Sequence, residues 1–290
     1  MEFRESFLEN LNTPHLLVIG GTGFIGHHLL KISQTKGWKL TSFSMSPPSP
    51  ERYVKNVKSD TNDGGAGNTF EYHLGVVENN LTNPDFQGFE VKTKKTFTHS
   101  AISLFTKKPS SKEFGDNYMR EQFGIPDTRY PKIKCFRTSI YAHRFSEVYS
   151  KYKIKLGVNR KQKKLYFEVY DLNEKLIDNN VFWTFDAIEK GSKKLNNLII
   201  INAKKKKIDR KDHFKYTDAK VLIDYKNFDN LINLIEEGAI RYDNRLGVYG
   251  PDTKTKDGRS LAGTPHNHGG GLRIMPSQVE KLFDTKLDLT

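Results

Sequence analysis

The sequence predicts an α/β protein that contains more strand than helix. Two observations support this fold class. Short apolar runs of strand length recur along the 290-residue chain, and a few amphipathic segments with helical spacing lie between them. The length corresponds to about two average domains or one large one, which is enough to bury a substantial core.

The first 50 residues are predicted to form a βαβ fragment. Residues 16–19 read as an apolar strand, and a glycine-rich loop and a helix-like stretch to Lys36 follow. A second strand-like run at 38–43 ends in the proline-rich segment 44–50. Proline removes a backbone donor and disfavours helix at the residue before it, so this segment is interpreted as a linker.

The rest of the chain alternates strands with a small number of helices. A helix is predicted to begin at Asn68 or Thr69, with Glu71 in its first turn. Residues 89–93 alternate apolar and polar side chains, which is typical of a half-buried strand. The later elements are expected as strands at 164–170, 181–185, 197–202 and 220–225, a helix at 227–239 and a short amphipathic helix at 277–283.

The charge balance favours an anionic partner. The chain has 47 Lys and Arg against 34 Asp and Glu, a net charge of +13. Such an excess raises the local concentration of polyanions such as nucleic acid. The alternative is a generally lysine-rich proteome. The lysine run 204–207 is likewise interpreted either as the solvated end of a strand or as a phosphate contact.

Several classes of protein are excluded. The single cysteine, Cys135, rules out an intramolecular disulfide and a cysteine-rich zinc site. No apolar run approaches the roughly 18 residues that a membrane span needs. The N-terminus lacks the basic-then-apolar order of a secretory signal. We therefore expect a soluble, cytoplasmic protein that does not engage membranes.

The glycines at 20, 23 and 26 resemble the dinucleotide fingerprint of extended short-chain dehydrogenases. Gly20, Gly23 and Gly26 lie between a strand and a helix, where glycine lets the backbone approach a pyrophosphate. Tyr149 and Lys153 would supply the acid–base pair of that family. No acidic residue for a ribose follows the second strand, however. A non-functional appendage is the interpretation, and a NAD(P)-dependent reductase the alternative.

The most informative motif is Pro84-Asp85, four residues, then Glu90-Val91-Lys92. In a strand, Glu90 and Lys92 point to one face, and a turn through Gly88 can bring Asp85 beside them. Two carboxylates and an ammonium group suit Mg²⁺-assisted hydrolysis of a phosphodiester. The alternative is an exposed hairpin with an ordinary charged face.

A series of blocks around this motif resembles one known family. The series resembles the MvaI/BcnI restriction endonucleases, which are relatives of the MutH repair nickase in the PD-(D/E)xK superfamily. The resemblance covers about residues 51–290. The blocks are 63–71, Leu74-Gly75, 78–81, Pro84-Asp85, Gly88, Glu90, Lys92, Leu104-Phe105, 241–247 and 266–274.

The resemblance implies a fold and a catalytic site. It implies a mixed central sheet flanked by helices with a C-terminal DNA-recognition lobe. The catalytic lobe is expected at about 51–150 and the recognition lobe at about 151–290. Asp85, Glu90 and Lys92 fall on the catalytic triplet, with Asp85 and Glu90 as Mg²⁺ ligands. Glu71 falls on a helical carboxylate beside the metal site, or else favours the dipole of a helix start.

The resemblance also places a set of polar residues in the part that reads DNA. Arginine pairs with guanine and aspartate accepts from cytosine N4, so these residue types suit base recognition. An Arg-x-Asp-x-Arg alternation on an extended segment puts all three groups on one side. The His-x-His pair before the glycines at 269–271 also invites a metal site, although close approach to DNA fits better. The predicted DNA-binding residues are Arg241, Asp243, Arg245, His266, His268, Arg273 and His99.

The predicted function is therefore that of a Mg²⁺-dependent, sequence-specific endonuclease of the type II restriction class. The resemblance implies double-stranded DNA as partner, a short GC-rich site, 5′-phosphate products, a monomer that cuts one strand at a time and a methyltransferase in the same system. The alternatives are a MutH-like nickase that needs protein partners, the NAD(P)-dependent reductase, and a DNA-binding protein that has lost catalysis.

Overall fold

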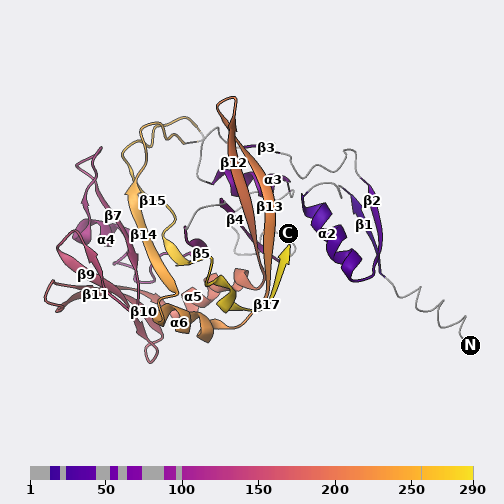
Figure 1. Cartoon of the computed structure of the whole chain (residues 1–290). Coiled ribbons are helices and arrows are strands. Elements are labelled where there is room, and N and C mark those ends of the chain that lie inside the picture. Colours follow the sequence, from indigo (N-terminus) through magenta and orange to yellow (C-terminus); the bar gives the residue numbers. More distant parts are fainter. Residues whose placement is uncertain are drawn as a thin grey trace, which may run out of the picture.

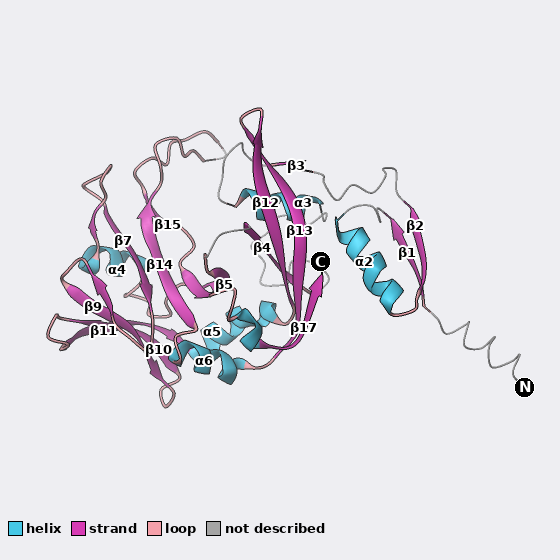
Figure 2. Cartoon of the chain, viewed as in Figure 1, coloured by secondary structure: helices cyan, strands magenta, loops and turns pink. Residues whose placement is uncertain are grey.

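The computed structural model describes residues 14–19, 24–43, 53–57, 64–73, 88–95, 100–255 and 257–289. Strands dominate over helices, and they form four separate sheets (Figure 2). The predicted α/β class with an excess of strand is confirmed.

The N-terminal unit is a two-stranded parallel sheet with one helix. It consists of β1 (His15–Ile19), α2 (Phe24–Thr35) and β2 (Lys39–Phe43). In Figure 1 it lies on the far side of β13 from β14. Gly26 is buried within α2, whereas Gly20 and Gly23 lie outside the described residues.

The sheet that contains Glu90, called the Glu90 sheet below, is mixed. Its strand order is β17-β13-β12-β4, with β3 paired to β13. The parallel pair is β4 with β12, and the other pairs are antiparallel. The helix α3 packs on one face, where Phe70 contacts Val91 and Ile201. The bounds are β3 (Val54–Lys55), α3 (Gly65–His73), β4 (Glu90–Lys95), β12 (Leu198–Ile208), β13 (Lys211–Tyr225) and β17 (Phe283–Leu289).

The sheet that contains Arg241, called the Arg241 sheet below, has the order β5-β16-β14-β7-β6, with β15 paired to β14. A further antiparallel sheet follows the order β11-β10-β9-β8. The strands of the Arg241 sheet are β5 (Ile102–Thr106), β6 (Ile125–Pro126), β7 (Lys134–Ile140), β14 (Ile240–Val248), β15 (Pro265–Asn267) and β16 (Gly271–Ile274). The remaining strands are β8 (Ser146–Val148), β9 (Tyr152–Asn159), β10 (Lys164–Tyr170) and β11 (Leu176–Thr184).

One hydrophobic core joins the Glu90 sheet to the Arg241 sheet. It contains Leu198 and Leu222 of the first sheet and Tyr242 and Leu272 of the second. The helices α5 (Phe185–Ser192) and α6 (Phe228–Glu236) contribute their apolar faces to it (Figure 1). The side chain of Asn227 caps α6 by accepting from a backbone N–H, as expected for a helix start at this position. The Glu90 sheet and the Arg241 sheet are therefore packed together through this shared core.

The predicted strands at 197–202 and 220–225 are real but too short. β12 and β13 continue beyond them and form a long hairpin (Figure 1). The turn between them is Asp209-Arg210, and both residues have positive φ, 49° and 62°. Positive φ at two central residues is the geometry of a type I′ hairpin turn, whose twist matches the flanking strands. The lysine run 204–207 is therefore part of a strand.

Two predicted helix boundaries are wrong. The helix expected from Asn68 or Thr69 already begins at Gly65. Thr69 does not cap it, because its buried hydroxyl donates to the side chain of Asn56. Consequently Glu71 lies beyond the first turn, and its interpretation as a helix-start carboxylate fails. The segment 277–283 forms only a 3-10 turn, η2 (Val279–Leu282), because the backbone is extended from Phe283 onward.

The sheets do not divide at residue 150. The Glu90 sheet takes β12, β13 and β17 from the C-terminal half, and the Arg241 sheet takes β5, β6 and β7 from the N-terminal half. The expected lobes at 51–150 and 151–290 therefore do not coincide with the sheets. Strands paired across such long sequence separations carry no local signal of their partners, which is why the boundary could not be placed from sequence.

Candidate active site

Glu90 is the buried centre of the candidate active site. Glu90 and Lys92 are two residues apart in β4 and project from the same face of the sheet. The ammonium group of Lys92 donates to Oε1 of Glu90. Val91 projects from the other face and packs against Phe70 of α3. The expected placement of Glu90 and Lys92 on one face, with Val91 in the opposite layer, is confirmed.

A second ammonium group reaches the same carboxylate oxygen from a distant segment. Lys194 lies in the 3-10 turn η1 (Lys193–Leu195) just before β12. Its Nζ donates to Oε1 of Glu90 over 2.6 Å. The Glu90 side chain is 1% exposed, and those of Lys92 and Lys194 are 25% and 24% exposed. A buried carboxylate is stable only when it is paired, and here two cations pair with it.

Sequence reasoning missed Lys194. It lies 104 residues from Glu90, and no local spacing connects the two. Its one feature in the sequence is that it shortly precedes the apolar run that becomes β12. That position brings it near Glu90 only because β12 pairs with β4.

The other carboxylate oxygen of Glu90 is suited to a metal ion. Within the described residues, Oε2 of Glu90 is buried and has no hydrogen-bond partner. An unpaired buried oxygen is costly, and carboxylate oxygens are preferred ligands of Mg²⁺. Asp85, the expected second ligand, lies outside the described residues. In the part of the chain that the structure describes, no three His, Cys, Asp or Glu side chains cluster as a metal site.

Glu71 belongs to α3 and lies beside the face of β4 that α3 covers. A Cβ on Gly67 would lie 3.9 Å from both Oε1 of Glu71 and Oγ1 of Thr93. Thr93, like Val91, belongs to the face of the sheet that α3 covers. Burial, and then the negative charge of Glu71, raise the pKa of Tyr216. The structure thus places Glu71 next to Thr93 and Tyr216, and its proximity to the metal site stays a prediction.

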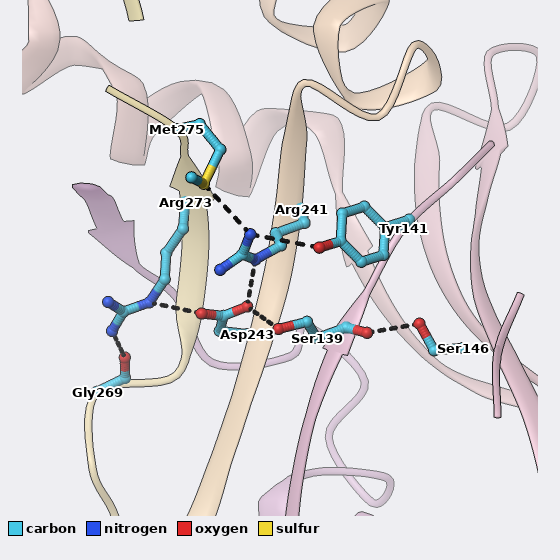
Figure 3. Close-up of polar contacts among 8 residues, drawn as sticks. All are labelled: Ser139, Tyr141, Ser146, Arg241, Asp243, Gly269, Arg273 and Met275. Atoms are coloured by element: carbon cyan, nitrogen blue, oxygen red, sulfur yellow. Dashed lines mark hydrogen bonds and ion pairs between the residues drawn. The ribbon is translucent and has the colours of Figure 1, made fainter. Parts of the chain in front are cut away.

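A polar network centred on Asp243 occupies one face of the Arg241 sheet (Figure 3). Oδ1 of Asp243 accepts from Nε of Arg241 at 2.8 Å and from the hydroxyl of Ser139 at 2.7 Å. Oδ2 pairs with Nε of Arg273 at 3.4 Å. Tyr141 accepts from Nη1 of Arg241 at 3.3 Å. These contacts orient both guanidinium groups before any partner binds.

The strand β14 presents this network in the predicted way. Arg241, Asp243 and Arg245 alternate with the buried residues Tyr242 and Asn244. The three polar groups therefore share one face, which confirms the expected effect of the Arg-x-Asp-x-Arg spacing. Arg245 is the exposed member of the three.

The two arginines of the network differ in their electrostatic surroundings. Burial lowers the pKa of both guanidinium groups. For Arg241, the hydrogen bond and charge of Asp243 outweigh burial, so that its pKa rises above the usual value. For Arg273, burial and the neighbouring charge of Arg245 dominate, so that its pKa falls. Arg241 is thus the better neutralised of the two.

His266 and His268 form an aromatic cluster beside the C-terminal end of β14. The ring of His266 stacks on Tyr249 with centroids 3.9 Å apart, and His268 lies edge-on at 4.6 Å. Nε2 of His268 lies 3.2 Å from the carbonyl oxygen of Val248. Burial is the main cause that lowers the pKa of both histidines. They are therefore neutral hydrogen-bonding groups near pH 7.

Gly247 allows Arg137 to join this cluster. A Cβ at Gly247 would lie 2.5 Å from Nη2 of Arg137 and 3.0 Å from the ring of His268. Arg137 is exposed and pairs across the sheet with Arg245. The structure thus brings Arg137 to the predicted recognition residues. His99, the remaining predicted DNA-binding residue, lies outside the described residues.

Tyr149 and Lys153, the residues expected as the acid–base pair of a reductase, each have other partners. Lys153 pairs with Glu174 over 2.7 Å. The hydroxyl of Tyr149 accepts from the backbone N–H of Arg137, and its ring packs against Phe136.

Comparison with known families identifies the chain. The model of the MvaI/BcnI restriction endonuclease family matches residues 49–283. The chain belongs to this family. The predicted resemblance to MvaI/BcnI endonucleases is therefore confirmed, whereas no comparison supports the dehydrogenase resemblance of the N-terminal glycines.

Solved structures of a restriction endonuclease have the same fold. MvaI in complex with its cognate DNA is 27% identical, with a TM-score of 0.72 over 82% of this chain and 92% of MvaI. MvaI in the absence of DNA is 28% identical, with a TM-score of 0.51 over 80% and 91% of the two chains. A comparison with curated proteins gives no match.

Membership of the MvaI/BcnI family sets the class of enzyme. The family consists of restriction endonucleases, so the predicted DNA nuclease activity is confirmed at that level. The N-terminal unit precedes the matched region. None of the helices in the described part of the chain is long and apolar enough to cross a membrane.

Proposed function

We propose that this protein is a Mg²⁺-dependent, sequence-specific endonuclease of double-stranded DNA, of the type II restriction class, that leaves 5′-phosphates. One observation carries the proposal. The buried Glu90 carboxylate has one oxygen held by Lys92 and Lys194, and the other has no hydrogen-bond partner among the described residues. Similarity to the DNA complex of MvaI, closer than to its DNA-free form, supports duplex DNA as the partner.

The chemistry is hydrolysis at phosphorus. Water adds to the phosphorus, the bond from phosphorus to O3′ breaks, O3′ takes up a proton, and the phosphate stays on O5′ of the following nucleotide. Asp85 and Glu90 would hold Mg²⁺, which supplies a Lewis acid for the phosphate and acidifies bound water. Glu71 would be a further carboxylate near this site.

The two lysines have different tasks in this proposal. Lys92 lies next to Glu90 on β4 and would contact the scissile phosphate, where its charge offsets the negative charge that builds in the transition state. Lys194 would act through Glu90 by holding Oε1, which leaves Oε2 directed at the metal ion. It is therefore a positioning residue.

Sequence recognition is assigned to the Arg241 sheet. Arg241, Arg273 and Arg245 would contact guanine edges, and Asp243 would hold the first two in place or accept from cytosine. His266 and His268 would act as neutral donors or acceptors. We also propose that the protein acts as a monomer and that a methyltransferase protects the host DNA.

The decisive test is incubation of the full chain with a sequenced plasmid. With Mg²⁺, the fragments should share one short sequence at their ends, and the ends should be ligatable without added kinase. Chelation of Mg²⁺ should abolish cleavage. Fragments with random ends, cleavage that survives chelation, or an intact plasmid under all conditions would contradict the proposal.

A further inference from the structure

The outer half of the β12–β13 hairpin is strongly basic. Residues 204–208 of β12 are all exposed, and four of the five are lysines. Arg210, Lys211 and Lys215 add three cations across the turn and along β13. In Figure 1 the hairpin extends well beyond α5 and α6, and β14 and β15 lie to its left.

The register of the hairpin divides these lysines between two faces. Lys204 is opposite Lys215, and Lys206 is opposite His213. Alternate residues of a strand point to opposite faces, so Lys204 and Lys206 share one face. Lys205 and Lys207 belong to the other.

On the second face, which carries Lys205 and Lys207, the role of Lys205 is structural. Lys205 forms an ion pair of 2.6 Å with Asp212, whose side chain is completely buried. Phe214, opposite Lys205, packs with Ala66 of α3 and Ala203. The charge of Lys205 therefore neutralises a buried carboxylate.

The face that carries Lys204 and Lys206 is the same face of the sheet that carries Glu90. In the parallel pairing of β4 and β12, Lys92 is opposite Ile200 and Lys94 is opposite Asn202. Two and four residues beyond Asn202 along β12 are Lys204 and Lys206. The buried start of this face belongs to the core shared with the Arg241 sheet. Its exposed continuation is therefore turned toward the same side as the recognition residues.

Three lysines of this face lie beyond the Glu90 cluster. Within the described residues, Lys94, Lys204 and Lys206 form no ion pair. Asp218 of β13 accepts from Asn202 and Thr217. The ring of Tyr53 lies 6.0 Å from the ammonium group of Lys206.

We propose that Lys94, Lys204 and Lys206, here called the lysine ladder, bind the phosphate backbone of duplex DNA that flanks the cleavage site. The proposal rests on the proposed function, because it starts from Glu90 as the cleavage centre. Lys206 lies six positions beyond Ile200, which is opposite Lys92, and six positions are about 20 Å of strand. This corresponds to about six base pairs along one DNA strand. The ladder therefore contacts DNA beyond a short recognition site.

Contacts of this kind add affinity without sequence information. Each lysine on a phosphate releases condensed counterions, so the logarithm of the affinity falls with the logarithm of salt concentration by about 0.9 per contact. The ladder should therefore govern the salt dependence of binding and the preference for long duplexes, while sequence preference depends on the Arg241 sheet.

The test compares two neighbouring lysines on opposite faces. Dissociation constants of the full chain for a 30-base-pair duplex are measured in chelator at several salt concentrations. Lys206→Gln should reduce the salt slope by about 1 and weaken binding between about threefold and tenfold near 0.1 M salt. Lys204→Gln should have the same effect, and the double variant should reduce the salt slope by about 2. Lys207→Gln removes the same charge from the other face and should leave the slope unchanged.

A second measurement varies the duplex length. The unmodified protein should bind the 30-base-pair duplex more tightly than one trimmed to the cleavage site, and the Lys204→Gln, Lys206→Gln double variant should lose this difference. Thermal unfolding should be unchanged, because both side chains are exposed. Equal effects of Lys206→Gln and Lys207→Gln, or no effect of either, would overturn the proposal. If the unmodified protein cuts a plasmid, such a result removes the ladder alone, and the nuclease assignment stands.

Discussion

The Glu90 sheet and the Arg241 sheet use charge in different ways. In the first, two lysines converge on one oxygen of a carboxylate that is 1% exposed. In the second, Asp243 is 18% exposed and is shared among two arginines and a serine. A buried carboxylate with two cations on one oxygen gives a rigid site, and among the described residues its other oxygen has no hydrogen-bond partner. The Asp243 network, which is partly buried, presents several hydrogen-bond donors to a partner.

The largest expected effect in this comparison comes from Lys194. Lys194→Ala should lower kcat about a hundredfold, the scale for loss of one preorganised electrostatic group. KM and DNA affinity in chelator should stay within twofold of the unmodified protein. Lys194→Arg, which keeps a charged donor, should restore part of kcat. Steady-state cleavage assays together with binding titrations would separate these quantities.

Lys190→Ala is the matched control for Lys194, because Lys190 is an exposed lysine of the adjacent helix α5. It should cleave at the normal rate. A normal kcat for Lys194→Ala would contradict its positioning role. So would a fall in unfolding temperature with unchanged kcat, since that result assigns Lys194 to stability only.

A smaller effect is expected from Asp243. Asp243→Asn removes the charge that pairs with Arg241 and Arg273. The preference for the cognate over an unrelated duplex should fall by about 1–3 kcal/mol, the scale for one well-formed base contact. Affinity for the unrelated duplex should be unchanged or slightly higher. Paired binding titrations on the two duplexes give both values.

Asp252→Asn, in the exposed loop after β14, serves as the control for Asp243. It removes the same charge without touching the network, so both affinities should change equally. If Asp243→Asn also shifts both duplexes by one common factor, Asp243 contributes only to the overall field and does not position the arginines.

How far the sequence predicts these two regions depends on how local their patterns are. Glu90 and Lys92, and Arg241, Asp243 and Arg245, alternate within single strands. A period of two already defines their faces, and the structure confirms both. Lys194 could not be found in this way, because its contact with Glu90 depends on the pairing of β4 with β12.

The β12–β13 hairpin and the helix α3 could not be predicted correctly from local sequence patterns. Lysine-rich residues 204–207 carry no apolar alternation, and only pairing with β13 and the turn at Asp209-Arg210 makes them strand. Asn68 and Thr69 are good capping types, yet Thr69 is used in a buried contact with Asn56. In both cases tertiary contacts override the local preference.

The smallest expected effect comes from the N-terminal unit. β1 and β2 form a sheet of their own, and the family match begins at residue 49. Removal of residues 1–45 should therefore leave the cleavage rate within about twofold of normal, well under 1 kcal/mol. A truncated protein that folds but does not cleave would show that this unit is part of the nuclease.

The assignment of cleavage to the Glu90 sheet and of sequence recognition to the Arg241 sheet is tested most directly with Glu90→Gln. Cleavage in Mg²⁺ and cognate-specific binding in chelator should be measured on the same folded preparation, with its unfolding temperature recorded. Cleavage should be lost while the preference for the cognate duplex is retained, because Glu90 and the Arg241 network lie on different sheets. A folded variant that still cleaves, or one that loses its sequence preference together with cleavage, would contradict this account.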